Sequence, residues 1–163
     1  MLSKKMEDAL NGQLNAEMFS AYLYLSMAAC FESINMQGMA KWMTVQAKEE
    51  HGHAMKFYDF IVDRAGRVKL AAIAAPETEW ASPLAAFEAA YGHEQKVTGL
   101  IGELVKLAKA EGDVATSIFL QWFVTEQVEE EKSTSEIVQK LKMVKDMAPA
   151  LLMLDGILGQ RGG

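Results

Sequence analysis

The chain has little cysteine, little proline and fewer basic than acidic residues, and each shortage excludes a class of protein. A single cysteine, Cys30, excludes an internal disulfide framework and a cysteine-rich zinc or iron site. The three prolines leave every long periodic segment uninterrupted, and the short alternating runs typical of strands are almost absent. With 16 basic against 22 acidic residues, the net charge of −6 argues against a nucleic-acid surface and suits a protein that attracts cations.

Long apolar runs are missing as well. The longest uncharged stretch, residues 18–31, is too short to cross a bilayer, and the N-terminus has no apolar segment of a secretory signal. At 163 residues, half of them apolar, the chain has the size of one ordinary domain. We therefore expect a soluble, cytoplasmic protein with a single domain over residues 1–163 and no nucleic-acid or membrane partner.

What remains is helical periodicity, which predicts an all-α fold made of two long helical hairpins. The first spans residues 3–65 with a turn near 34–38, and the second spans 83–144 with a turn at 112–113. Residues 66–81 show no helical pattern. Fully extended, this connection could span ~50 Å, whereas each long helix is ~42 Å long, so the connection can run from one end of the bundle to the other. The second and third helices are then expected to run parallel. The apolar pattern of residues 147–158 predicts a short fifth helix.

Each long helical segment carries a core seam whose residues step alternately by three and four, and polar side chains interrupt every seam near its middle. Glu17 lies 33 residues before Glu50, as Glu94 lies 33 residues before Gln127, and the two pairs are offset by 77 residues. The pattern Glu…Glu-x-x-His is thus repeated as Glu…Gln-x-x-Glu, one copy in each hairpin. Pseudo-twofold packing of the hairpins would bring six side chains together: Glu17, Glu50, His53, Glu94, Gln127 and Glu130.

None of the seam positions holds lysine or arginine, so these four glutamates would meet without a cationic partner. Burying them ionised would cost several kcal/mol each. Protonation of some of them, in a metal-free structural bundle, is one alternative. Two divalent cations would balance the charge, and carboxylates with one imidazole suit Fe(II) or Mn(II), and also zinc. A glutamate from each of two helices plus two i, i+3 pairs from the other two helices is the inward-facing arrangement of di-iron carboxylate bundles.

At this point the sequence resembles the non-haem ferritins of bacteria and archaea, over essentially the whole chain. The resemblance rests on six segments of the sequence: the motifs around Glu17 and Tyr24, Glu49-Glu50-His51-Gly52-His53, residues 67–70, Ser82-Pro83-Leu84, residues 87–94 and residues 121–131. It implies a ferritin-like four-helix bundle with a long crossover loop and a short C-terminal fifth helix, assembled as a hollow cage of 24 subunits.

The resemblance also implies a role for particular residues. A ferroxidase centre maps onto Glu17, Glu50, His53 and Glu94, with Gln127 and Glu130 completing the second iron position and Tyr24 and Trp122 beside it. Glu17, Glu50 and His53 would hold the first iron, and Glu50 and Glu94 would bridge. A third iron position matches Glu49, Glu126, Glu129 and Glu130. The implied function is iron storage and detoxification, in which Fe(II) is oxidised by O2 or hydrogen peroxide and deposited as Fe(III) mineral.

Two departures from related families bear on this interpretation. Gln127-x-x-Glu130 stands where a bacterioferritin has a second Glu-x-x-His, and His51 stands where a bacterioferritin has its haem-ligating methionine. We therefore do not expect haem. The neutral Gln127 leads to the hypothesis that one iron position is weak, so that oxidised iron moves on past Glu49, Glu126 and Glu129. The alternative function is a non-storing dimetal redox enzyme of iron or manganese, such as a peroxidase.

Overall fold

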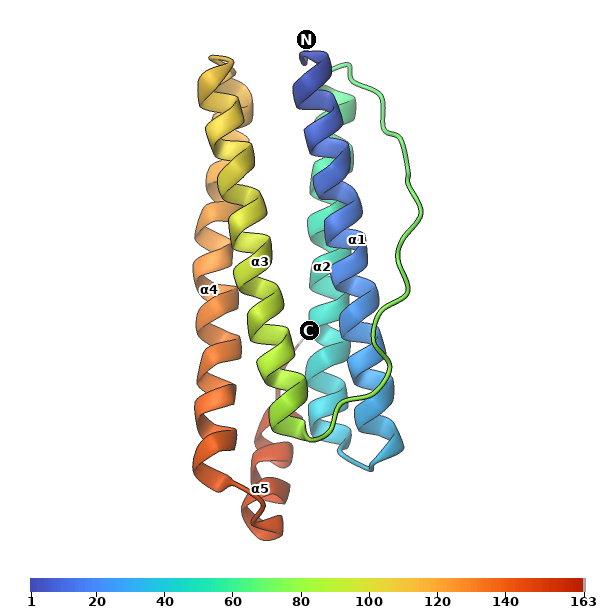
Figure 1. Ribbon diagram of the computed structural model, residues 1–163, viewed down its shortest axis with the longest axis vertical. Helices are drawn as coiled ribbons and strands as arrows, with labels where there is room; N and C mark the ends of the chain where they lie inside the picture. Colours follow the sequence, from blue (N-terminus) through green and yellow to red (C-terminus); the bar gives the residue numbers. More distant parts are fainter. Residues whose placement is uncertain (163) are drawn as a thin grey trace.

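The computed structural model describes residues 1–162, which contain five helices and no strand, so the all-α expectation is confirmed. The helices are α1 (Lys4–Ser33), α2 (Gln37–Asp63), α3 (Pro83–Ala110), α4 (Val114–Val144) and α5 (Ala148–Leu158). Antiparallel hairpins α1–α2 and α3–α4 pack into a four-helix bundle, and α5 lies at its lower end in Figure 1. Within residues 1–162, no helix combines the length and the apolar character that crossing a membrane requires.

Residues 64–82 connect α2 to α3 and run the length of the bundle along α1, so α2 and α3 are parallel as predicted (Figure 1). Side chains of α1 hold this connection in register. Asn11 donates from Nδ2 to the carbonyl oxygen of Arg67 at 3.0 Å and accepts from the amide of Lys69 at 2.6 Å. Nearer the other end of α1, Ser26 Oγ donates to the carbonyl oxygen of Glu77 at 2.6 Å. The connection is therefore hydrogen-bonded to α1 at several heights.

Three of the long helices begin with a side-chain cap from the residue directly before the helix. Ser3, Ser82 and Asp113 each accept a hydrogen bond from the amide three residues further on, at the starts of α1, α3 and α4. Pro83 follows Ser82 at the first helical position, where its missing N–H costs nothing. These caps satisfy amides that have no partner inside the helix.

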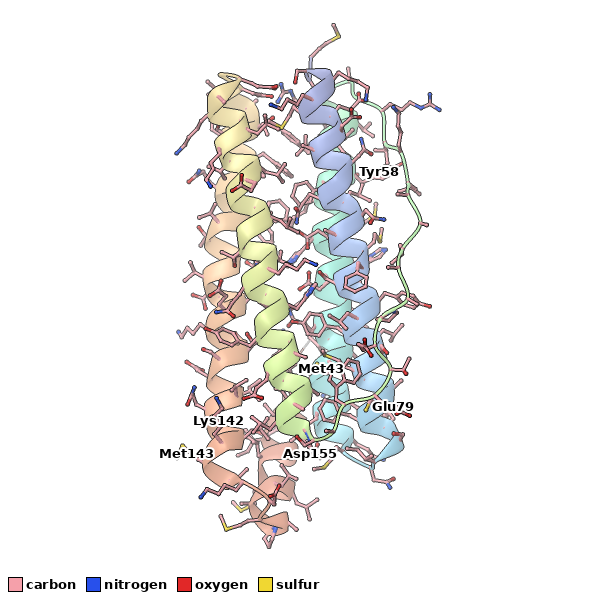
Figure 2. The ribbon with its side chains drawn as sticks, in the orientation of Figure 1. Met43, Tyr58, Glu79, Lys142, Met143 and Asp155 are labelled. Carbon is pink, nitrogen blue, oxygen red and sulfur yellow. The ribbon has the colours of Figure 1, made fainter. Side chains whose placement is uncertain are left out.

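The start of α2 is capped by a residue of α5 instead. Its N-cap residue, Met36, makes no side-chain hydrogen bond. Asp155 accepts from the amides of Met39 at 2.8 Å and Gly38 at 3.1 Å, and it lies at the lower end of the bundle in Figure 2. A Cβ added to Gly38 would lie 1.8 Å from the carbonyl oxygen of Asp155. Glycine at this position thus permits α5 to approach α2.

The bundle core is divided into two apolar clusters with a polar layer between them. One cluster, next to α5, includes Tyr24, Phe31, Met43, Phe87 and Leu141. The other, towards the far end, includes Leu10, Phe57, Ile101, Leu120 and Phe123. In each long helix the buried polar residues of the central layer fall, in sequence, between its contributions to the two clusters: Glu17 in α1, Glu50 and His53 in α2, Glu94 in α3, and Gln127 and Glu130 in α4. Apolar packing above and below therefore fixes the polar layer at mid-bundle.

Candidate metal centre

The six side chains that the spacing places at one depth meet in this polar layer. All are buried, with exposed fractions from 1% for Glu17 to 5% for His53 and Glu130. α1 supplies one of them, α2 two, α3 one and α4 two: Glu17, Glu50, His53, Glu94, Gln127 and Glu130. Each points inward because it occupies a seam position of its helix.

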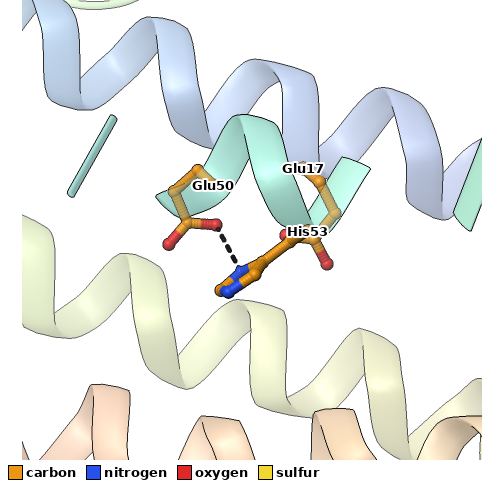
Figure 3. Close-up of side chains that lie close together, drawn as sticks. All are labelled: Glu17, Glu50 and His53. Atoms are coloured by element: carbon orange, nitrogen blue, oxygen red, sulfur yellow. Dashed lines mark ion pairs between the residues drawn. The ribbon is translucent and has the colours of Figure 1, made fainter. Parts of the chain in front are cut away.

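Three groups of candidate ligands overlap there, and in each group the ligand atoms lie within 4.8 Å of one another. The first group is Glu17, Glu50 and His53, which Figure 3 shows projecting from α1 and α2. The other two are the sets Glu50/Glu94/Glu130 and His53/Glu126/Glu130. Nδ1 of His53 lies 3.3 Å from Oε2 of Glu50. Because residues are shared between groups, the three candidate positions are adjacent.

Two buried glutamines orient these carboxylates, and neither is among the site residues predicted from the sequence. Gln13 donates from Nε2 to Oε1 of Glu17 at 2.8 Å. Gln46 donates to Oε1 of Glu50 at 3.1 Å and to Oε2 of Glu130 at 2.7 Å. The sequence does carry a signal for both, because each glutamine lies four residues, or one helical turn, before a seam glutamate.

The carboxylate of Glu94 is held from two sides. Tyr24 donates its hydroxyl hydrogen to Oε1. Gln127 Nε2 lies 3.2 Å from Oε2 and 3.2 Å from the carbonyl oxygen of the same residue, and 3.3 Å from Oγ1 of Thr98. Tyr24 and Gln127 therefore both contact the centre directly, and Thr98 helps to orient the amide of Gln127.

Burial makes the four central carboxylates hard to ionise. It raises the pKa of Glu17 to about 8, with the charge of Glu50 as the second cause. It raises the pKa of Glu130 to about 7, with the charge of Glu94 as the second cause. The pKa values of Glu50 and Glu94 are raised by burial too. Within residues 1–162, no lysine or arginine forms an ion pair with any of the four.

The donor set fits divalent cations. Two buried acceptors, Oε2 of Glu17 and Oε1 of Gln46, have no hydrogen-bond partner among residues 1–162. Buried acceptors without partners are costly, and a cation beside Glu17 would satisfy one of them. Carboxylate oxygens with one imidazole suit Fe(II), Mn(II) or Zn(II). The geometry, the missing countercharges and the unpartnered oxygen thus agree on a metal centre.

The three outlying carboxylates differ in position. Glu126 is half-buried, and its Oε1 lies 3.8 Å from Nε2 of His53. Glu129 is exposed and belongs to none of the ligand groups found within residues 1–162. Glu49 is also outside those groups and forms an ion pair with Arg161 at 2.6 Å. Of the three, the structure brings only Glu126 within ligand distance of the centre.

Aromatic rings close the centre on the α4 side. The ring of Trp122 meets that of His53 edge-on, with centroids 5.3 Å apart. Lys56 Nζ lies 4.4 Å from the ring centre of Trp122, whose side chain is 41% exposed. Trp122 is therefore beside the centre, as the resemblance implied.

The other two histidines lie outside the ligand groups. His51 is exposed and lines an apolar groove of about 510 Å³ between α1 and α2. His93 is half-buried, and its Nε2 lies 2.7 Å from Oγ of Ser20. Burial lowers the pKa of His93 to about 4, so this imidazole is neutral at physiological pH. His93 thus supports the α1–α3 contact next to Glu94.

Comparison with known proteins gives a consistent result. Residues 7–144 match the family model of the ferritin-like domain. A bacterial non-heme ferritin of Bacteroides fragilis (strain 638R) is 44% identical, covering 99% of this chain and 100% of its own. One of Staphylococcus aureus (strain USA300) is 38% identical, covering 99% and 97%. An open pore ferritin of the archaeon Archaeoglobus fulgidus superposes with a TM-score of 0.98 at 55% identity, covering 99% and 100%. The chain therefore belongs to the ferritin family.

Proposed function

We propose that this protein stores iron, oxidising Fe(II) at the centre between its four helices and depositing Fe(III) mineral inside a multi-subunit cage. The observation that carries the proposal is the set of three overlapping ligand groups, which share Glu50, His53 and Glu130. The ferritin names of the relatives agree with it. The cytoplasm is the proposed compartment, because mineral storage there removes reactive Fe(II).

In this proposal the centre holds two iron ions as substrate. Glu17, Glu50 and His53 bind the first, and Glu94, Gln127 and Glu130 bind the second. Glu50 and Glu94 each bind both iron ions. Two divalent ions replace the protons that the buried carboxylates otherwise keep, because the positive charge favours the ionised form. A third iron position uses Glu126 and Glu130, with Glu49 and Glu129 as the outlying carboxylates.

Two irons held next to each other match the electron count of the oxidant. Each Fe(II) gives one electron, so two Fe(II), one O2 and two protons yield two Fe(III) and one hydrogen peroxide. Hydrogen peroxide accepts the same two electrons and, with two protons, becomes two water molecules. Adjacent metals can hold both ends of one small oxidant. The chain contributes fixed carboxylates, which the glutamine hydrogen bonds hold in place as the iron charge rises.

The surface of the subunit favours assembly. On α5 the side chains of Leu152, Met153 and Ile157 are exposed by 63%, 71% and 56%. A second groove, of about 280 Å³, lies between α4 and α5 and is lined by Met143, Met153 and Ile157 among others. Contiguous apolar surface of this kind typically marks a subunit contact. We propose a homo-oligomeric cage of 24 subunits, in which these surfaces are buried.

The decisive experiment is aerobic loading with excess Fe(II), removal of free iron and measurement of iron retained per chain. Storage predicts retention far above three irons per chain as soluble mineral. Glu50→Gln, which alters a ligand of two groups, should abolish fast oxidation, whereas the matched change Glu103→Gln on the exposed face of α3 should not. Retention of two or three irons would instead indicate the non-storing dimetal enzyme. No retention would contradict the metal centre itself.

A further inference from the structure

The last residues of the chain fold back onto α2, and Arg161 makes three contacts there. Its Nη2 lies 2.6 Å from Oε2 of Glu49, and its Nη1 donates to the carbonyl oxygen of Trp42 at 3.4 Å. The guanidinium carbon lies 4.4 Å from the ring centre of Trp42. Stacking on an aromatic ring and pairing with a carboxylate hold the planar guanidinium in one orientation.

The packing of α5 against α2 holds Arg161 at this contact. Asp155 binds the first amides of α2, and Gly38 leaves room for the backbone of α5. The chain after α5 is thereby anchored beside the same helix that carries Glu49, and only a few residues separate Asp155 from Arg161. Arg161 is therefore held close to Glu49 by the fold of the whole C-terminal segment.

Glu49 is directly before Glu50 on α2, and its charge contributes to the raised pKa of Glu130. Electrostatically, Glu49 thus belongs to the surroundings of the metal centre. Within residues 1–162, however, it is in none of the ligand groups. Of the four central and three outlying glutamates, Glu49 is the one whose carboxylate forms an ion pair with an arginine or a lysine within residues 1–162. Arg161 therefore neutralises a carboxylate whose charge reaches the centre.

We infer that Arg161 is a positioning residue of the iron path, which competes with iron for Glu49 and so weakens retention of an additional cation beside Glu126 and Glu130. The inference rests on the proposed function. While Arg161 pairs with Glu49, a cation near His53 finds two carboxylates, Glu126 and Glu130. Release of Arg161 adds the charge of a third carboxylate, and an added negative charge tightens cation binding.

The test is anaerobic calorimetric titration of the full-length, metal-free protein with Fe(II), which measures binding without oxidation. In Arg161→Gln the third, weakest binding step should tighten roughly fivefold, because a partly exposed ion pair is worth on the order of 1 kcal/mol. Lys41→Gln is the matched control: it removes one positive charge from an exposed position of α2, and Lys41 forms no ion pair with residues 1–162. This control should leave the third step unchanged.

A double-mutant cycle separates competition from general disturbance of the C-terminus. In a Glu49→Gln background, Arg161→Gln should no longer tighten the third step, because the contested carboxylate is gone. An unchanged third step in Arg161→Gln, or an equal effect in both backgrounds, would overturn the inference while leaving a two-iron centre standing. A parent protein that binds no Fe(II) at all would overturn the proposed function as well.

Discussion

The amide of Gln46 joins the two halves of the proposed metal centre, with Nε2 lying 2.7 Å from Oε2 of Glu130 on the opposite hairpin. The same nitrogen lies 3.1 Å from Oε1 of Glu50 on its own helix. These hydrogen bonds lower the pKa values of both glutamates against the raising effect of burial. One neutral side chain thereby orients two candidate ligands and favours their ionised form, which is the form that can bind cations.

Replacing Gln46 by leucine should weaken Fe(II) binding. The change keeps the side-chain volume similar but removes the donor to Glu50 and Glu130, and loss of such an orienting hydrogen bond typically costs 10- to 100-fold in metal affinity, about 1.4 to 2.7 kcal/mol. Anaerobic Fe(II) calorimetry measures the effect. Gln121→Leu, at an exposed position of α4, is the control. An affinity within about twofold of the parent would contradict the orienting role.

The metal-free protein should become less stable as the pH rises from about 4.5 to 8. The pKa of Glu17 is about 8 in the folded chain, against 4.5 when exposed, and burial is the main cause. Between these values the folded chain holds a proton that the unfolded chain has released, so unfolding is favoured by up to about 1.4 kcal/mol per pH unit for one such group. The contribution of Glu17 is thus fully present below pH 4.5 and lost as the pH rises through 8.

Urea unfolding of metal-free protein at a series of pH values tests this sign. Glu17→Gln removes the titrating group and should flatten the dependence, whereas Glu136→Gln, at an exposed position of α4, should not. Added divalent cation should stabilise the parent more at pH 8 than at pH 5, because cations compete with protons for the carboxylates. Stability that increases across this window would show that the central carboxylates are not buried as described.

Gln127→Glu should retain iron longer and slow its passage to the mineral. The amide of Gln127 donates to Glu94 and contacts Thr98, so the change replaces a neutral donor by another buried carboxylate. With metal the added charge strengthens the second iron position; without metal it repels Glu94 and lowers stability. Release of Fe(III) after a two-iron load is the measurement, with Gln121→Glu as a control for charge. Unchanged release would refute the hypothesis that a neutral residue here weakens the site.

Tyr24→Phe should shift Fe(II) binding to higher pH. The hydroxyl of Tyr24 donates to Glu94, and this hydrogen bond lowers the carboxyl pKa against the effect of burial. Without the donor, Glu94 keeps its proton to higher pH and competes less well for iron. Fe(II) affinity as a function of pH measures the shift. Tyr58→Phe, on the exposed side of α2, should leave the profile unchanged. Equal profiles for both variants would assign Tyr24 to packing alone.

Gly38→Ala should loosen α5. The new Cβ would lie 1.8 Å from the carbonyl oxygen of Asp155, so the backbone of α5 must move and the cap of α2 is lost. We expect a loss of about 1 to 3 kcal/mol and faster amide exchange over residues 148–158. Gly12→Ala, with no atom within 4 Å of its Cβ, should instead stabilise α1 by up to about 1 kcal/mol. Equal stability of both variants would contradict the close approach.

Helical periodicity was sufficient to predict most of the fold. It predicted the fifth helix at residues 147–158, where the structure has Ala148–Leu158, and a crossover at 66–81 within the observed 64–82. The repeated 33-residue interval also predicted that Glu17, Glu50, Glu94 and Gln127 lie at one depth. Such inferences succeed because a helix has a constant rise and turn per residue, so spacing along the chain determines both height and face.

Tertiary packing decided which polar groups touch. Gln46 and Glu130 are 84 residues apart, Arg161 and Glu49 are 112 apart, and Asp155 and Gly38 are 117 apart. Helical periodicity predicts which face of a helix a residue occupies. It does not determine the relative rotation and height at which one helix packs against another. The ligand layer was determined by the sequence because it repeats with the helices. The contacts that orient it, and the pairing of Glu49 with Arg161, exist only because the hairpins and α5 pack in one particular arrangement.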